Sequence, residues 1–284
     1  MTMQFTHERE FTYNRSYRGP IKLVCLDWAG TTMDFGCMAP AVVFCAVFEQ
    51  EGVPISIEEA RIPMGAHKKV HIGLITKIPS VRARWIETKG SEPTDEDVTR
   101  MFENFVPQQE ACLSEYSELI PGTLDIIAQC RSRGYKIGST SGYLPGMLKI
   151  NLADAIKQGY EPDATFGAGD VPRGRPFGHM VLRNIVELDI PNVQSVVKVD
   201  DTLTGIEEGL NAGGWAIGLA ISGNEVGLNY ADWMSLSEQV KQEHRDRIYP
   251  TMYQRGAHYV VDSIADLMPC LDDIEARLKR GEKP

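Results

Sequence analysis

Acidic, basic and hydroxyl side chains occur at the ends of predicted strands, where together they could carry out phosphoryl transfer. Asp27 follows one apolar segment, Ser141 follows a second, and the pair Asp200 and Asp201 follows another. Arg175 lies in a loop just before a predicted helix. Phosphoryl transfer to an aspartate requires a nucleophilic carboxylate, a hydroxyl, a cation and a further carboxylate able to bind Mg²⁺. The metal would let Asp27 approach a phosphoryl group despite their like charges.

The elements that must position these groups alternate between strands and helices. Short apolar, β-branched segments predict strands at 21–26, 136–140, 163–166, 195–199, 215–220 and 258–261. Helical patterns separate them at 123–133, 144–158, 176–188, 203–211, 236–255 and 264–280, and Pro176 is expected to open its helix. This alternation predicts an α/β fold with a doubly wound, mostly parallel sheet, whose ligands bind beyond the carboxyl ends of the strands.

A separate stretch lacks any strand pattern. Apolar residues recur at helical spacing from 39 to 50, and several helical patterns continue from 57 to 116. We therefore expect an all-helical insertion between the first two strands. A chain of 284 residues is also longer than a usual single domain, which favours a core plus a second module.

Composition excludes several classes of function. The net charge of -10 argues against a nucleic-acid partner, and no apolar stretch reaches the roughly 20 residues that a membrane span needs. The 6 cysteines are scattered without a CxxC pair, as is usual in a reducing compartment. The polar first twenty residues resemble no signal or transit peptide, so a cytoplasmic location is expected.

The strand-end residues carry a resemblance to a known superfamily. Asp27-Trp-Ala-Gly-Thr-Thr32, Ser141, Arg175 and Asp201 match, in order and position, the four motifs of the haloacid dehalogenase superfamily. The resemblance implies a Rossmann-like core domain at 21–36 and 115–284, a helical cap domain at 37–114 and an N-terminal extension at 1–20.

Narrower motifs resemble the phosphonoacetaldehyde hydrolase family, also called phosphonatases. They are Asp34-Phe-Gly-Cys37, Pro63-Met-Gly-Ala-His-Lys68, Gly138-Ser-Thr-Ser-Gly-Tyr143 and Gly174-Arg-Pro176. The resemblance implies hydrolysis of the carbon–phosphorus bond of phosphonoacetaldehyde, a small phosphonate, to acetaldehyde and phosphate. It also implies a homodimer joined through the cap and a place in the breakdown of 2-aminoethylphosphonate.

Ala29 and Lys68 distinguish this chemistry from that of a phosphatase. Superfamily phosphatases carry a general acid two residues after the nucleophile, whereas Ala29 offers only its backbone carbonyl. A carbon leaving group needs its electrons delocalised, and an imine formed by Lys68 provides that sink. The Lys68 amine must then be neutral, so we expect its pKa well below about 10.4.

Further roles follow from the resemblance. Ser141, Arg175 and Thr31 are expected to contact phosphate, and Asp27, the Ala29 carbonyl and Asp201 to bind Mg²⁺. His71 is expected to assist proton transfer near the imine. The remaining expected substrate contacts are Cys37, Met64, Gly65 and Tyr143.

Some alternatives stay open in the sequence. Lysines at helix starts such as Lys68 and Lys69 are usually solvated, and Asp201 could simply cap the next helix. The superfamily pattern has another acid four residues after Asp201, where this chain has Gly205, while Asp200 replaces a frequent glycine. The rival functions are hydrolysis of another phosphate or phosphonate without an imine, and a non-catalytic binding protein.

Overall fold

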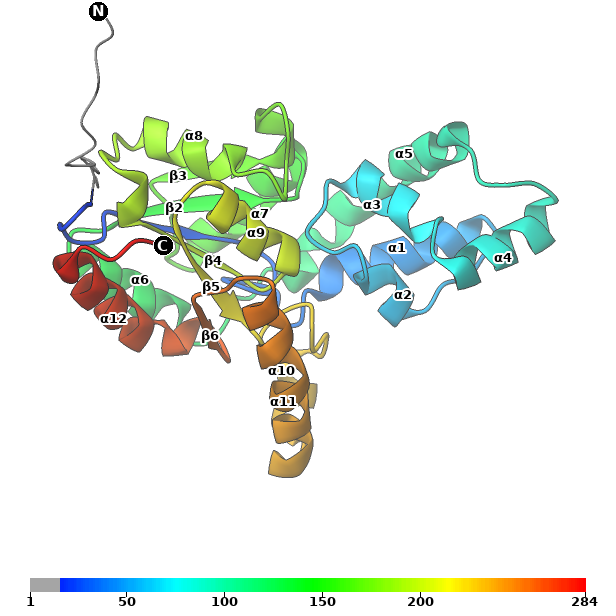
Figure 1. Ribbon diagram of the computed structural model, residues 1–284. Coiled ribbons are helices and arrows are strands. Elements are labelled where there is room, and N and C mark those ends of the chain that lie inside the picture. Colours follow the sequence, from blue (N-terminus) through cyan, green and yellow to red (C-terminus); the bar gives the residue numbers. More distant parts are fainter. Residues whose placement is uncertain (1–15) are drawn as a thin grey trace, which may run out of the picture.

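A six-stranded, fully parallel sheet forms the centre of the molecule (Figure 1). The computed structural model describes residues 16–284, so most of the expected extension at 1–20 lies outside the described residues. The strand order is β3-β2-β1-β4-β5-β6, with β1 in register with both β2 and β4. The strands are β1 Leu23–Leu26, β2 Lys136–Ser141, β3 Ala164–Gly167, β4 Val196–Asp200, β5 Trp215–Leu219 and β6 Tyr259–Val261. The predicted α/β class with a parallel, doubly wound sheet is confirmed.

Helices cover both faces of the sheet because its central strands are apolar on both sides. In β1, Val24 and Leu26 join the larger hydrophobic core, whereas Leu23 and Cys25 pack in a separate cluster with Val181 of α8. Figure 1 shows α8 and α9 on one side of the sheet and α6 and α12 on the other. The helices of this region are α6 Thr123–Ser132, α7 Pro145–Lys157, α8 His179–Glu187, α9 Leu203–Asn211, α10 Tyr230–Ser235, α11 Glu238–Gln254 and α12 Leu267–Arg280.

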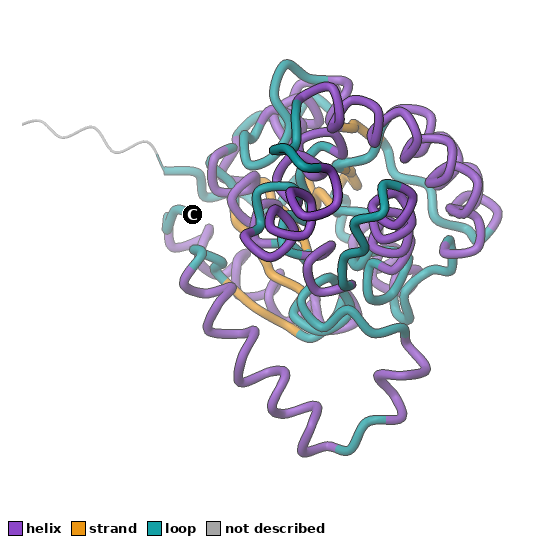
Figure 2. The backbone as a smooth tube through the Cα atoms, turned by 90° about the vertical axis from the view of Figure 1, so that its right-hand side faces the viewer, coloured by secondary structure: helices purple, strands orange, loops and turns teal. Residues whose placement is uncertain are grey.

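Five of the six α-helices between β1 and β2 form a separate body to the right of the sheet in Figure 1. We call residues 37–114 the helical insertion. Its helices are α1 Met38–Gln50, α2 Ile57–Arg61, α3 Lys68–Ile75, α4 Pro79–Lys89 and α5 Asp95–Cys112. Phe44 of α1 stacks on Phe105 of α5, with ring centroids 4.5 Å apart. Figure 2 looks onto this body and shows its helices in front of the strands.

Two details differ from the expectation. The helix expected at 176–188 begins only at His179, since Asn211 Nδ2 donates to the Pro176 carbonyl (2.7 Å) and Gly178 packs closely against Ala212. The short helix α10 also lies in a segment for which no helix was predicted. Among the described helices, none has the length and apolar character required to cross a membrane.

Candidate active site

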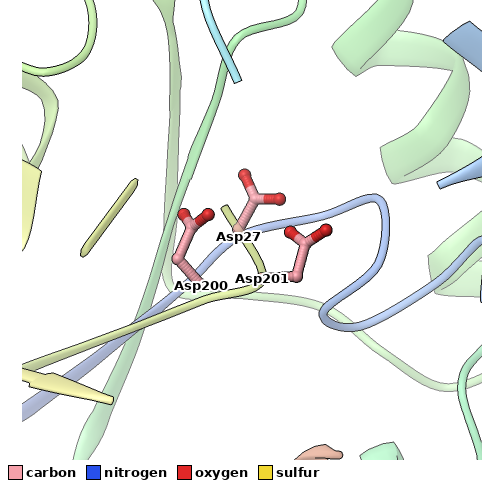
Figure 3. A group of neighbouring side chains, drawn as sticks. All are labelled: Asp27, Asp200 and Asp201. Carbon is pink, nitrogen blue, oxygen red and sulfur yellow. The ribbon is translucent and has the colours of Figure 1, made fainter. Parts of the chain in front are cut away.

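Three aspartate carboxylates meet at the carboxyl ends of β1 and β4. Asp27 follows β1, Asp200 ends β4 and Asp201 follows it, and each offers a carboxylate oxygen within 4.8 Å of the others. Figure 3 shows the three carboxylates side by side and pointing the same way. All three side chains are buried. Adjacent parallel strands bring these groups together because their carboxyl ends share one edge of the sheet.

Arg175 connects these carboxylates to a buried network. Its Nη2 donates to Asp27 and lies 2.9 Å from Asp200 Oδ2, while its Nε donates to Glu208 Oε2 at 3.0 Å. Thr140 Oγ1 accepts from Nη2 at 3.1 Å and donates to Glu208 at 3.0 Å. The guanidinium is therefore held in one orientation, facing the predicted nucleophile.

Lys198 and Glu208 belong to this site although the sequence interpretation did not include them. Lys198 Nζ donates to Asp200 Oδ2 at 2.7 Å and lies 3.7 Å from Glu208. Both side chains are fully buried. A signal was available for Lys198, because a charged residue inside the apolar strand Val196–Asp200 needs a buried partner.

The structure accounts together for the two departures from the superfamily pattern, Asp200 in place of glycine and Gly205 in place of an acid. A Cβ atom on Gly205 would lie 1.9 Å from Cγ of Asp200, so the Asp200 carboxylate occupies the space beside the helix that any side chain at 205 would need. Asp200 Oδ1 also accepts from the Thr202 backbone N–H (3.0 Å) and hydroxyl (2.7 Å). Asp200 and Gly205 are therefore one coupled feature, with the acid supplied from the strand instead of the helix.

The charges of the site fit a divalent cation. Asp27, Asp200, Asp201 and Glu208 would carry four negative charges when ionised, against two positive charges on Arg175 and Lys198. Burial raises the pKa of Asp27 to about 6 although Arg175 opposes this shift. Burial, with Asp200 and Asp27 nearby, also raises the pKa of Asp201. Carboxylate oxygens are the ligands that Mg²⁺ prefers, and a bound cation would offset this excess charge.

Asp201 is oriented by neighbours that leave its carboxylate directed at this cluster. The backbone N–H of Asn224 donates to Asp201 Oδ2 at 2.7 Å, and the Thr31 hydroxyl lies 3.5 Å from Oδ1. The cap of α9 is instead Thr202, whose side chain accepts from the Gly205 N–H. The open alternative that Asp201 caps this helix is therefore wrong.

Lys68 approaches the same site from the helical insertion, as the first residue of α3. Its side chain is buried, with Nζ 4.7 Å from the ring centroid of Tyr143 and 5.6 Å from that of Phe44. No ion pair within residues 16–284 involves this ammonium group. Burial lowers the pKa of Lys68 to about 8, which agrees with the expectation from the sequence. Lys69 lies instead along an outer cleft of the insertion.

One small cavity gathers most of the predicted site residues. Its volume is about 20 Å³, and its walls combine residues of the sheet edge with residues of the insertion. The predicted residues that line it are Asp27, Ala29, Cys37, Met64, Gly65, Lys68, Ser141, Tyr143 and Arg175. Pro40, Gly142 and Thr202 complete the lining and were not predicted.

Of the predicted site residues, Thr31, His71 and Asp201 lie outside this lining. Thr31 is buried beside Asp201, as described above. The His71 ring stacks on Phe44 with centroids 3.8 Å apart, and its Nε2 hydrogen-bonds to the Ala60 carbonyl at 2.8 Å. Burial lowers the pKa of His71 to about 3, so its imidazole is neutral.

Comparisons with known proteins agree with this fold. The haloacid dehalogenase-like hydrolase family model matches residues 21–213. The phosphonoacetaldehyde hydrolase of Hahella chejuensis is 43% identical over 274 residues, covering 96% of this chain and 93% of that protein. The enzyme of the same name from Bordetella pertussis is 44% identical over 267 residues, covering 93% of this chain and 97% of the relative.

A solved structure is similar over nearly the whole chain. The crystal structure of a phosphonoacetaldehyde hydrolase-like protein from Oleispira antarctica has a TM-score of 0.95 and 43% identity, covering 97% of this chain and 100% of that one. Fold and site thus define a hydrolase of the haloacid dehalogenase class. Within that class, the chain belongs to the phosphonoacetaldehyde hydrolase family.

The coupling of Asp200 to Gly205 predicts a non-additive effect on stability. Alanine inside a helix normally gains about 1 kcal/mol over glycine. Gly205→Ala should instead lose about 1–3 kcal/mol, because its Cβ collides with the Asp200 carboxylate. In an Asp200→Gly background that penalty should disappear, which urea unfolding of the four proteins of the cycle measures.

Gly73→Ala is the matched control, since its Cβ would meet only Val98 methyl groups at 3.7 and 3.9 Å. It should be neutral or stabilising. Additive effects of the substitutions at 200 and 205 would contradict the coupling.

Proposed function

We propose that the protein hydrolyses the carbon–phosphorus bond of phosphonoacetaldehyde, using Asp27 as nucleophile and Lys68 as the imine-forming amine. The observation that carries this proposal is the shared cavity, in which an amine with a lowered pKa and a carboxylate beside an arginine face the same space. The names of the relatives, at 41–44% identity, support the same substrate.

The surroundings of Asp27 favour a carbon leaving group. Ala29 lines the cavity at the position where an oxygen leaving group would need an acid. Lys68 lies in the same cavity and can form an imine with the aldehyde of the substrate. The site thus lacks an acid that would protonate a leaving oxygen, and instead offers an imine that can accept the electron pair of the broken carbon–phosphorus bond.

The chemical steps follow from these two groups. The neutral amine of Lys68 attacks the aldehyde carbon, and loss of water gives an iminium. Asp27 then attacks phosphorus, the carbon–phosphorus bond breaks, and its electron pair enters the iminium to give a neutral enamine. Water hydrolyses the resulting aspartyl phosphate. Protonation of the enamine carbon and hydrolysis of the imine release acetaldehyde and regenerate Lys68.

Binding of the phosphoryl group falls to residues at the sheet edge. We propose that Arg175 and Ser141 contact its oxygens, since both line the cavity beside Asp27. Asp27, the Ala29 carbonyl and Asp201 would hold Mg²⁺, with Asp200 beside them. The phosphate contact of Thr31 stays a prediction. When bound, Mg²⁺ would neutralise charge between the nucleophile and the phosphoryl group.

Cys37, Tyr143, Met64 and Gly65 are proposed to shape the part of the cavity that receives the aldehyde. Tyr143 lies over the Lys68 ammonium group, which supports that placement. Proton transfer by His71 stays a prediction. His71 and Lys68 share Phe44 as a neighbour, which places the imidazole near the amine.

Domain division and assembly are part of the same proposal. We propose that residues 37–114 act as a cap over a core formed by 21–36 and 115–284. We further propose a homodimer joined through the cap, where the exposed apolar side chains of Ile62, Val70, Leu74 and Ile86 offer contact area. Sedimentation velocity would show a monomer if this assembly were wrong. The six free cysteines support a reducing, cytoplasmic location.

Lys68→Arg tests the proposed function most simply. Arginine keeps the positive charge but cannot form an imine. Release of acetaldehyde and phosphate from phosphonoacetaldehyde should therefore fall by at least about 10³-fold, whereas Lys69→Arg should leave it unchanged. A coupled assay for acetaldehyde, read beside phosphate release, measures both products. Substantial turnover by Lys68→Arg would point to hydrolysis without an imine.

The lowered pKa of Lys68 predicts a pH dependence. Below about pH 8 the amine gains a proton and cannot attack the aldehyde, so kcat/KM should fall about tenfold per pH unit on the acid side. Profiles at two temperatures identify the group, because the pKa of an amine moves strongly with temperature and that of a carboxylate hardly moves. A profile without an amine-like ionisation below the ordinary lysine pKa would contradict the assignment.

A further inference from the structure

Arg61, the last residue of α2, connects the helical insertion to the core without a carboxylate partner among residues 16–284. Its side chain is buried, and no ion pair within residues 16–284 includes it. Nη1 donates to the Gly36 carbonyl at 2.7 Å and to Asn224 Oδ1 at 3.3 Å. Nη2 donates to the Gly227 carbonyl at 3.2 Å. A buried guanidinium is costly unless its N–H groups are bonded, so these neutral oxygens are what stabilises it there.

The backbone around Arg61 is shaped to receive it. Gly227 has a φ of 68°, and a Cβ at this position would lie 2.6 Å from Arg61 Nε and 2.8 Å from its Cζ. Gly36 has a φ of 86°, and a Cβ there would lie 2.1 Å from the Leu228 carbonyl oxygen. Both positions thus require glycine for conformation and for space. The guanidinium fits a socket formed by the core loop that contains Gly227 and by the segment around Gly36 that leads into the insertion.

Asn224 links this socket to the proposed metal site. Its side chain accepts from Arg61 Nη1, and its Nδ2 lies 3.4 Å from the Arg61 carbonyl oxygen. Its backbone N–H donates to Asp201 Oδ2 at 2.7 Å. One residue of the core therefore contacts both the insertion and a carboxylate of the active site.

Arg61 also lies at the start of the segment that carries Lys68. The Met64 N–H donates to the Arg61 carbonyl at 3.0 Å, and the Met64 carbonyl accepts from Thr204 Oγ1 of the core at 3.3 Å. Lys68 follows at the first position of α3. The position of Lys68 relative to Asp27 thus depends on where the Arg61 end of this segment rests on the core.

The active-site cavity must open for each substrate molecule. Its volume of about 20 Å³ accommodates about one water molecule, which is too small for a phosphonate. Separation of the insertion from the core would widen this space, and the bonds of Arg61 to Asn224 and Gly227 cross that boundary.

We propose that these bonds, the Arg61 latch, hold the insertion closed on the core and so place Lys68 opposite Asp27, breaking and re-forming in each turnover. Arg61 is in this view a positioning residue, because it acts through Lys68 and does not line the cavity. The proposal rests on the proposed function for its kinetic consequence, whereas its structural consequence can be tested without substrate.

The structural test uses hydrogen exchange of the ligand-free protein, followed by mass spectrometry of peptides covering 62–66 and 222–228. Arg61→Met removes all donors of the latch while keeping an apolar stem. These peptides should exchange at least about tenfold faster in Arg61→Met, and to an intermediate extent in Arg61→Lys. Arg82→Met is the control, since Arg82 forms its ion pair with Glu92 inside the insertion and not with the described part of the core. Unchanged exchange in Arg61→Met would overturn the latch.

The kinetic test separates positioning from a purely structural role. Loss of the latch should lower kcat for phosphonoacetaldehyde about tenfold or more with a smaller change in KM, because closure follows binding. A rise in KM with unchanged kcat would contradict the proposal. Asn224→Ala, which leaves Arg61 in place, should lower kcat in the same direction and provides the test if Arg61→Met does not fold. If the wild-type protein releases no acetaldehyde, the proposed function fails while the exchange result still decides the latch.

Discussion

The buried guanidinium of Arg175 is the interaction on which the proposed site depends. It contacts Asp27, Asp200 and Glu208 at once, and all four side chains are buried or nearly so. Removing one partner of such a cluster commonly costs about 3–5 kcal/mol, since the remaining charges stay buried and uncompensated. Parallel strands, the absence of a side chain at Gly205 and the position of Glu208 on α9 all serve to assemble this cluster. The fold therefore sets Asp27, the proposed nucleophile, in place before any ligand arrives.

Lys68 is placed in a contrasting environment. It arrives from a different part of the chain and is surrounded by the rings of Phe44 and Tyr143 instead of by a bonded carboxylate. Burial therefore lowers its pKa, whereas the cation of the core, Arg175, stays charged among its acids. A lysine with a lowered pKa and a charged arginine can line one cavity because the insertion and the core give them different surroundings. The cavity between insertion and core is where the two environments meet.

Much of this arrangement could be predicted from the sequence because local patterns encode it. The apolar segment before Asp27, the alternation of strands and helices, and the helix starting at Lys68 each have a short-range signal. The network around Arg175 had a weaker one. Lys198 interrupts an apolar strand, and Glu208 lies three residues after Gly205, on the same face of the helix. Neither pattern indicates which residue the charged side chain contacts.

Other features depend on contacts between distant segments. The start of α8 at His179 follows from packing of Gly178 against Ala212, and the burial of Arg61 follows from oxygens of Gly36, Asn224 and Gly227. His71 shares a helix with Lys68, yet its ring turns to Phe44 instead of the cavity. Periodicity gives the face of a helix only approximately, and tertiary packing decides what that face meets.

The central claim is that Lys68 forms an imine in the cavity that contains Asp27. Borohydride reduction with and without phosphonoacetaldehyde, followed by peptide mass mapping, tests it most directly. We predict a substrate-dependent reduced adduct on Lys68, none on Lys69, and none at position 68 in Lys68→Arg. Magnesium-dependent phosphate release without any adduct on Lys68 would contradict the account and leave a hydrolase that acts without an imine.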